Sequence, residues 1–191
     1  MSTPEEVLAF WLDEVGPEGW YKGGAELDET CRDRFADTWD SAAEGGLSLW
    51  LTYPSGTLAY IILTDQLPRN MWRGDARSFA MDTAALAAAK TAISRGWDLR
   101  IDSPGRQFFY MPLMHSENLS DQDRCVRLFH TRMPESESNL LHARAHREVI
   151  RRFGRFPHRN AVLNRETPEI EADFLSNGGY GQTVEDIRSA A

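Results

Sequence analysis

Residues 144–175 read RAHREVIRRFGRFPHRNAVLNRETPEIEADFL and combine helix-stop signals with a dense set of arginines. A helix is expected to end at Gly154, because glycine adopts the left-handed conformation that closes a helix and Pro157 cannot continue one. Residues 156–160 then form a loop. Thr167-Pro168-Glu169 is typical of a new helix start, with a capping hydroxyl, a proline in the first turn and an acid behind it. The stretch predicts two helices joined by a polar loop, and it is where we expect a site.

The same stretch is basic within an acidic chain. Residues 144–165 hold seven arginines and one acid, a formal charge of +6, whereas the whole chain carries −8. Residues 1–50 hold twelve acids and three basic residues, so acidic N-terminal helices are expected to neutralise the arginines. Arginine is suited to buried or bidentate pairing. The arginines are therefore expected either to form internal ion pairs or to line a pocket for an anion. Net acidity argues against nucleic-acid binding.

The composition predicts one folded domain. The chain has 191 residues, of which 41% are hydrophobic, and no linker or low-complexity segment divides it, so we expect a single helical domain over residues 1–191. It shows no apolar run long enough to span a bilayer and no secretory signal, which predicts a soluble, cytoplasmic protein without a membrane partner. Cys31 and Cys125 lack metal-site spacing and are expected to be reduced structural thiols.

Helical spacing and capping signals recur along the chain. Thr3-Pro4-Glu5-Glu6 is a capping box that predicts a first helix to about Val15. Residues 55–67 read as a helix that is apolar on nearly every side and ends at Pro68, with a strand as the competing interpretation. Asp65 on this helix is expected to be buried and ion-paired, most simply with Arg69, Arg155, His158 or Arg159. Further helices are predicted over residues 27–45, 76–95, 103–117, 120–133 and 136–153, with connections at 16–24 and 47–53. The pattern predicts an all-α protein of stacked antiparallel helix pairs.

Three motifs resemble the signatures of a known family. They lie at residues 65–74 (DQLPRNMWRG), 111–117 (MPLMHSE) and 152–160 (RFGRFPHRN), and they are similar to signatures of the bacterial domain-of-unknown-function family 924. The resemblance covers nearly the whole chain, with Asn164 standing where that family typically has glycine. It implies a tetratricopeptide-repeat-like, right-handed α-α superhelix of about seven to eight stacked antiparallel helices. It implies no function, because the family is uncharacterised.

Two classes of function are open. The first is a helical-array binding module with a polar, arginine- and histidine-lined pocket for a peptide or a small anionic ligand. The residues predicted to bind the ligand are Asp65, Arg69, Asn70, Arg155, Arg159 and Asn160. We expect the three signatures to meet in space, because each is polar and lies at a helix end or kink.

The second class is a small enzyme that acts on an anionic substrate by acid–base or metal-assisted chemistry. Its candidate catalytic residues are His115, Glu117 and His158. His142 and His146 share one helix face at metal-ligand spacing, but no HExxH motif accompanies them and the sequence favours no metal site. A structural interpretation, in which these side chains only cap helices and hold loops, is equally open. The sequence does not tell whether the protein uses a cofactor, and it does not tell the oligomeric state.

Overall fold

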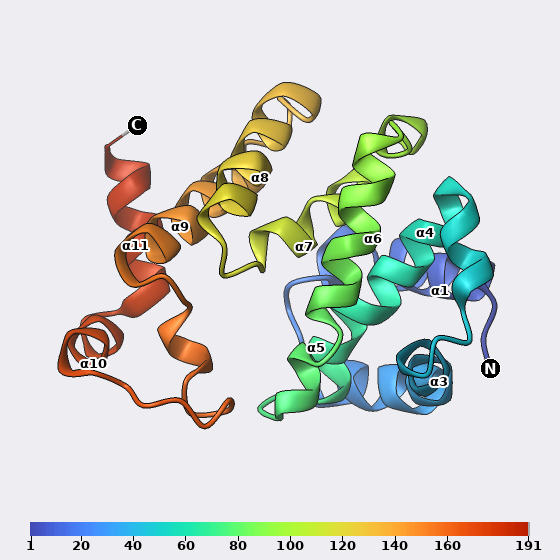
Figure 1. The fold of residues 1–191 in the computed structure, drawn as a ribbon, viewed down its shortest axis with the longest axis horizontal. Helices are drawn as coiled ribbons and strands as arrows, with labels where there is room; N and C mark the ends of the chain where they lie inside the picture. The colour runs from blue at the N-terminus through green and yellow to red at the C-terminus, as the bar shows by residue number, and fades with distance from the viewer. Residues whose placement is uncertain (191) are drawn as a thin grey trace. The chain divides into compact units, whose positions relative to one another are not determined.

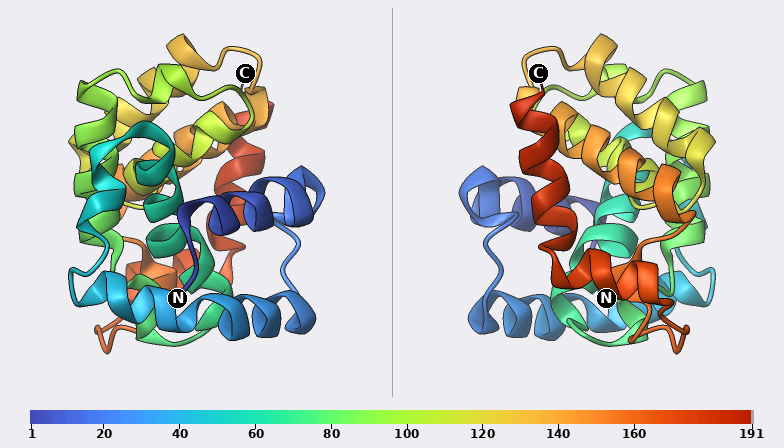
Figure 2. Two further views of the ribbon diagram at one scale, coloured as in Figure 1. Left: turned by 90° about the vertical axis from the view of Figure 1, so that its right-hand side faces the viewer. Right: turned by 90° about the vertical axis from the view of Figure 1, so that its left-hand side faces the viewer.

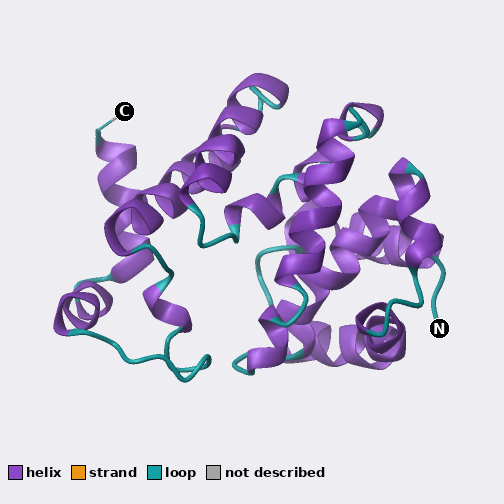
Figure 3. Ribbon diagram, in the orientation of Figure 1, coloured by secondary structure: helices purple, strands orange, loops and turns teal. Residues whose placement is uncertain are grey.

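The structure is a computed structural model that describes residues 1–190. Every regular element in this part of the chain is helical and none is a strand, which confirms the all-α prediction (Figures 1 and 3). The strand interpretation of residues 55–67 is therefore wrong. Seven α-helices of the described part have eight residues or more, and shorter α, 3-10 and π segments connect them. The contacts divide the chain into two compact units, Met1–Pro112 (unit 1) and the remainder from Leu113 (unit 2).

Unit 1 begins with a capped helix, as predicted. The Glu6 amide donates to the Thr3 hydroxyl at 3.3 Å, and the Thr3 amide donates to the Glu6 carboxylate at 2.7 Å. The elements of this unit are α1 Pro4–Leu8, a π-helix Ala9–Val15, α2 Gly16–Gly19, α3 Ala25–Ala43, a 3-10 helix Ser48–Thr52, α4 Pro54–Ile61, a π-helix Ile62–Gln66, α5 Leu67–Met71, 3-10 helices Ala76–Phe79, Asp98–Arg100 and Gly105–Phe109, and α6 Asp82–Ser94. The short α7, Met111–Met114, spans the boundary between the units.

The helix that begins with α4 is the centre of unit 1. Residues 56–68 are buried without interruption, as expected for an element that is apolar on nearly every side. α1, α6 and the 3-10 helix Ser48–Thr52 all pack on α4 (Figure 1). Asp65 is fully buried, and its Oδ1 lies 3.6 Å from Nη2 of Arg69, so the predicted ion pair is made within this helix.

Pro68 does not end the helix, contrary to the prediction. The chain passes through the π-helix Ile62–Gln66 and continues as α5 to Met71. The Leu67 amide bonds to the Ile62 carbonyl five residues back. This wider turn precedes the proline, whose ring would otherwise meet the carbonyl four residues before it in a regular α-helix. The proline therefore redirects the hydrogen bonding without stopping the helix.

Four other boundaries in the first two-thirds of the chain differ from the predictions. The helix expected over 76–95 is a 3-10 turn capped by Asp75, followed by α6, which starts at Asp82. The connection 16–24 contains the short α2. The helix expected over 103–117 is a 3-10 turn and the four-residue α7. Asn118, and not Ser120, caps the next helix, because its side chain accepts from the Ser120 amide at 2.9 Å. At Asp75 and Asn118 the difference lies where a side-chain cap fixes the helix start at another residue than expected.

Unit 2 consists of α8 Leu119–Arg132, α9 Glu137–Phe153, the 3-10 helix Pro157–Arg159, α10 Glu169–Ser176 and α11 Gly179–Ser189. α8 and α9 pack together after a short connection, and α11 crosses α9 (Figure 2). As predicted, α9 ends at Gly154, which has φ 69° and donates to the Ile150 carbonyl at 2.8 Å. Val149, Ile150 and Phe156 form the apolar cluster beneath the loop that follows.

α11 was not predicted. Glycines stand at 178, 179 and 181, a composition that indicates a turn when the sequence is considered alone. In the structure Gly178 and Gly179 have positive φ and lead directly into the helix. Packing against α9 buries Val184 and partly buries Tyr180, and such tertiary contacts supply most of the stability of a short helix.

Candidate functional site

Arg155 joins the end of α9 to α10. Its Nε donates to Glu171 Oε1 at 2.9 Å, and its Nη2 donates to Oε2 at 3.0 Å and to the Glu166 carbonyl at 2.9 Å. Glu171 is 5% exposed. Burial acts to raise the pKa of Glu171, but hydrogen bonds from Arg155 and Asn160 outweigh it, and the pKa lies below its ordinary value. The pair is a bidentate link between two helices.

Asn160 is the centre of the polar network. Its Nδ2 donates to Glu171 Oε2 at 2.6 Å and more distantly, at 3.3 Å, to the Thr167 hydroxyl. Its Oδ1 accepts from Arg165 Nε at 3.0 Å. The residue is 1% exposed, so both ends of its amide are satisfied away from solvent. An amide is required here because one end must donate to a carboxylate while the other accepts from a guanidinium.

Glu117 connects the second signature (residues 111–117) with the third (residues 152–160). Its carboxylate accepts from Arg165 Nη1 at 2.7 Å, from Arg165 Nη2 at 3.0 Å and from the Phe156 amide at 2.8 Å. Partial burial acts to raise the pKa of Glu117, but the bonds from Arg165 and Phe156 outweigh it and lower the pKa overall. Glu117 is thus held as a carboxylate and is poorly suited to donate a proton. The expected meeting of the second and third signatures is confirmed, while a meeting with the first stays a prediction.

Arg159 and His158 both lie close to the ring of Phe156. The Arg159 guanidinium lies 4.8 Å from the centre of the Phe156 ring, and its Nη2 donates to the His115 carbonyl at 3.1 Å. Arg159 is buried, whereas His158 is exposed with its ring 5.7 Å from that of Phe156. The ring of Phe156 is therefore flanked by one guanidinium and one imidazole, and His115 joins the group through its backbone carbonyl.

His142 and His146 do share one face of α9, and Tyr180 of α11 contacts both. His142 Nδ1 and the Tyr180 hydroxyl are 2.6 Å apart, and His146 Nδ1 lies 2.8 Å from the His142 carbonyl. Since a carbonyl only accepts, Nδ1 of His146 carries a proton. Burial lowers the pKa of His146 to about 3, helped by neighbouring imidazoles, although the His142 carbonyl bond acts in the other direction. Among residues 1–190, no group of three or more His, Cys, Asp or Glu side chains is placed to hold a metal ion.

The polar residues of the first signature lie in unit 1 and have partners there. Arg69 donates to the Asp65 carbonyl and, at 3.1 Å, to Asp82. Asn70 Nδ2 donates to Asp28 at 2.9 Å. The surrounding surface depression of about 620 Å³ also contains Arg73, which forms two 2.8 Å bonds with the same Asp28. Asn70 and Arg73 thus hold the end of α5 against α3, and Arg69 bonds to the first residue of α6.

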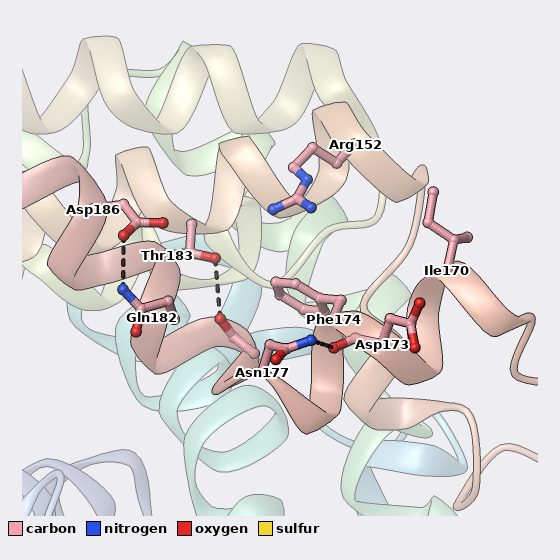
Figure 4. A pocket seen from close by; sticks show the side chains of 9 residues that line it. Arg152, Ile170, Asp173, Phe174, Asn177, Gln182, Thr183 and Asp186 are labelled. Atoms are coloured by element: carbon pink, nitrogen blue, oxygen red, sulfur yellow. Dashed lines mark hydrogen bonds between the residues drawn. The ribbon is translucent and has the colours of Figure 1, made fainter.

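Arg152, which also belongs to the third signature, faces a pocket that was not predicted from the sequence. The pocket has a volume of about 280 Å³ and lies among α9, α10 and α11 (Figure 4). It is lined by Arg152, Ile170, Asp173, Phe174, Asn177, Gly179, Gln182, Thr183 and Asp186. Because α11 was not predicted, the residues that it contributes could not be associated with Arg152.

Arg152 is held over aromatic rings in this pocket. Its guanidinium carbon is 4.9 Å from the centre of the Phe153 ring and 5.3 Å from that of Phe174. Within the described part of the chain it makes no hydrogen bond and no ion pair. The contrast is direct, because Arg151 next to it is paired with Glu148 at 2.7 Å and Arg155 with Glu171. Its charge does act on Glu148, one turn earlier on α9, and helps to lower the pKa of that carboxylate, but the nearer Arg151 holds the hydrogen bonds. Arg152 is therefore a cation of the third signature whose guanidinium donors stay without a hydrogen-bonded anion in the described chain.

The described chain is all-helical, and hydrogen bonds from the Phe156 amide to Glu117 and from Arg159 to the His115 carbonyl join the second and third signatures. No described helix is both long and apolar enough to cross a membrane. The chain belongs to the family described as bacterial protein of unknown function (DUF924), whose family model matches residues 7–179.

A solved structure of a protein of unknown function from Agrobacterium tumefaciens is similar to this chain. The two are 38% identical in sequence and superpose with a TM-score of 0.85, over 91% of this chain and 97% of that chain. No curated protein matches the sequence. The resemblance of the three signatures to this family is thus confirmed, and function has to be argued from the site.

Proposed function

We propose that the chain is a helical binding module that takes a small anionic ligand in the pocket among α9, α10 and α11, with Arg152 as the anion-binding group. The observation that carries this proposal is the guanidinium of Arg152 in a concave site, where it makes no hydrogen bond and no ion pair within 4.0 Å to the described residues. Arginine presents a planar set of donors that matches carboxylate or phosphate oxygens in a bidentate manner. Contacts with two phenylalanine rings hold the group in place, which reduces the entropy lost on binding.

The polar network of Arg155, Asn160 and Glu171 holds in place one of the helices that line the pocket. Arg155 and Asn160 both bind Glu171 at the first turn of α10, the helix that supplies Asp173 and Phe174 to the pocket. A ligand site is most effective when its side chains stand on elements that cannot shift. In this proposal the network positions α10 and does not itself contact the ligand.

The test is a titration of the purified full chain with acetate and with inorganic phosphate, followed by two-dimensional amide NMR. An exposed site of this size is expected to bind in the millimolar range. Arg152→Gln should weaken binding at least fivefold, because it removes the only cation in the pocket lining. Arg147→Gln is the matched control, because Arg147 stands on the same helix, is paired with Asp123 and does not line the pocket, so this variant should bind like the parent. Equal binding by the Arg152→Gln variant and the parent would overturn the proposal.

Other assignments stay predictions beside this one. They are ligand binding by Asp65, Arg69, Asn70, Arg155, Arg159 and Asn160, recognition of a peptide, and the alternative enzyme with His115, Glu117 and His158. The same holds for the tetratricopeptide-repeat-like superhelix, the single domain over residues 1–191 and the cytoplasmic location. Packing of α8 on α9 after a short connection supports paired antiparallel helices within unit 2.

A further inference from the structure

The pocket around Arg152 also contains free negative charge. Within the described part of the chain, the Asp173 carboxylate makes no hydrogen bond or ion pair, because only the backbone carbonyl of this residue accepts, from Ser176 and Asn177. Asp186, the other acid of the lining, accepts from Gln182 at 2.7 Å. Asp173 and Asp186 lie on opposite sides of Phe174 in Figure 4. The pocket thus offers one arginine and two carboxylates around an aromatic ring.

The opposite charges do not satisfy one another. Arg152 is not within 4.0 Å of either carboxylate, since no ion pair joins it to any residue of the described chain. Opposite charges that share a small pocket without contact can be bridged by a ligand that carries both signs. A purely anionic ligand would bind Arg152 but would be repelled by the nearby acids, so the pocket discriminates by charge pattern.

We propose that the ligand is an α-amino acid with an apolar side chain, bound as a zwitterion. Its carboxylate binds the Arg152 guanidinium and its ammonium group binds Asp173. Its side chain covers Phe174 and Ile170, and Ile170 is 68% exposed at the pocket edge. The volume of about 280 Å³ lies just below the usual range of small-molecule sites, which suits one amino acid better than a longer peptide. This inference rests on the proposed function, because it uses the same arginine as the anion-binding group.

A competing explanation is that Arg152 only ties α9 to α10 through its ring contacts. A structural role of this kind would affect stability and would not create selectivity among ligands. The distinguishing measurement is therefore a comparison of related ligands on one protein, in which any change in stability cancels.

The experiment titrates the full chain with L-leucine, N-acetyl-L-leucine and L-leucinamide, using NMR shifts of amides in α10 and α11. N-acetylation removes the ammonium charge, and the amide removes the carboxylate. L-leucine should bind at least fivefold more tightly than either blocked form. Asp173→Asn should abolish the advantage of L-leucine over N-acetyl-L-leucine, because L-leucine loses its ammonium partner while N-acetyl-L-leucine is no longer repelled and binds at least as tightly as to the parent. Glu185→Gln, a change at an exposed acid of α11 paired with Arg188, is the control and should keep the advantage.

The outcomes separate the two proposals. If L-leucine and N-acetyl-L-leucine bind equally to the parent and both are weakened by Arg152→Gln, the amino-acid proposal is overturned and anion binding at Arg152 stands. If Arg152→Gln changes the affinity for none of the ligands, both proposals are overturned. Loss of the L-leucine advantage in Asp173→Asn, with Arg152→Gln weakening every carboxylate ligand, supports both.

Discussion

Replacing Asn160 with alanine tests whether the polar network holds unit 2 together. The change removes the 2.6 Å bond to Glu171 and the 3.0 Å bond from Arg165, both made to ionised partners. Hydrogen bonds to charged groups contribute about 1.5–3 kcal/mol each. The loss is partly offset because Glu171 keeps Arg155 and Arg165 keeps Glu117. We expect the free energy of unfolding to fall by about 3 kcal/mol.

Thr167→Val is the matched control for this prediction. Thr167 is exposed and receives only the longer, 3.3 Å bond from Asn160, so its loss should cost less than about 1 kcal/mol. Urea denaturation followed by far-UV circular dichroism gives the free energy of unfolding for each variant. All six tryptophans lie in unit 1, so tryptophan fluorescence recorded in parallel reports that unit alone.

Two results would refute the reasoning. One is a loss below about 1 kcal/mol for Asn160→Ala, which would show that the network is solvated and replaceable. The other is an equal loss for Thr167→Val, which would show that the Glu171 and Arg165 bonds are not the important ones. A shift of the circular dichroism transition without a shift in fluorescence would place the damage in unit 2, as expected.

Three further predictions concern conformation, pH and thiol reactivity. Asn164 has φ 52°, so Asn164→Gly should leave the free energy of unfolding nearly unchanged while Asn164→Val lowers it by about 1–2 kcal/mol, measured in urea. Burial favours neutral His146 in the folded chain, so its contribution to stability is present above the ordinary pKa of about 6.5 and is lost as the pH falls towards 3. The parent should therefore lose about 1–2 kcal/mol more than His146→Gln between about pH 7 and pH 5, and parallel pH profiles would contradict this. Burial, followed by the charge of Asp28, raises the pKa of Cys31 to about 12, and burial also raises the pKa of Cys125. Neither thiol should therefore react with a thiol reagent before the protein unfolds.

Local signals in the sequence were sufficient at two helix ends that depend on neighbouring residues. The Thr3 capping box and the helix end at Gly154 both form as predicted, because a capping hydroxyl and a left-handed glycine act within one turn. The position of Asn164 is instructive, since the family's usual glycine corresponds to a positive φ in this chain. The prediction that the helix ends at Pro68 is wrong, because a π turn before the proline removes the clash between its ring and the preceding turn.

The site required information that no local pattern contains. The sequence indicated that the arginines near Gly154 need carboxylate partners, but the chain has 29 acids and only the fold selects Glu117 and Glu171. The acidic N-terminal segment, proposed as the neutralising partner, supplies neither of them. α10 supplies Glu171 to Arg155 but no hydrogen-bonded carboxylate to Arg152, and this difference could be recognised only in three dimensions.

The central claim is that Arg152 binds the carboxylate of a small ligand, and a crystal structure of the full chain with L-leucine tests it most directly. The predicted result is density beside the ring of Phe174, with carboxylate oxygens about 2.7–2.9 Å from the Arg152 guanidinium nitrogens. Density for the ligand elsewhere, or an Arg152 side chain paired with Asp173 or Asp186 in a closed pocket, would contradict the claim.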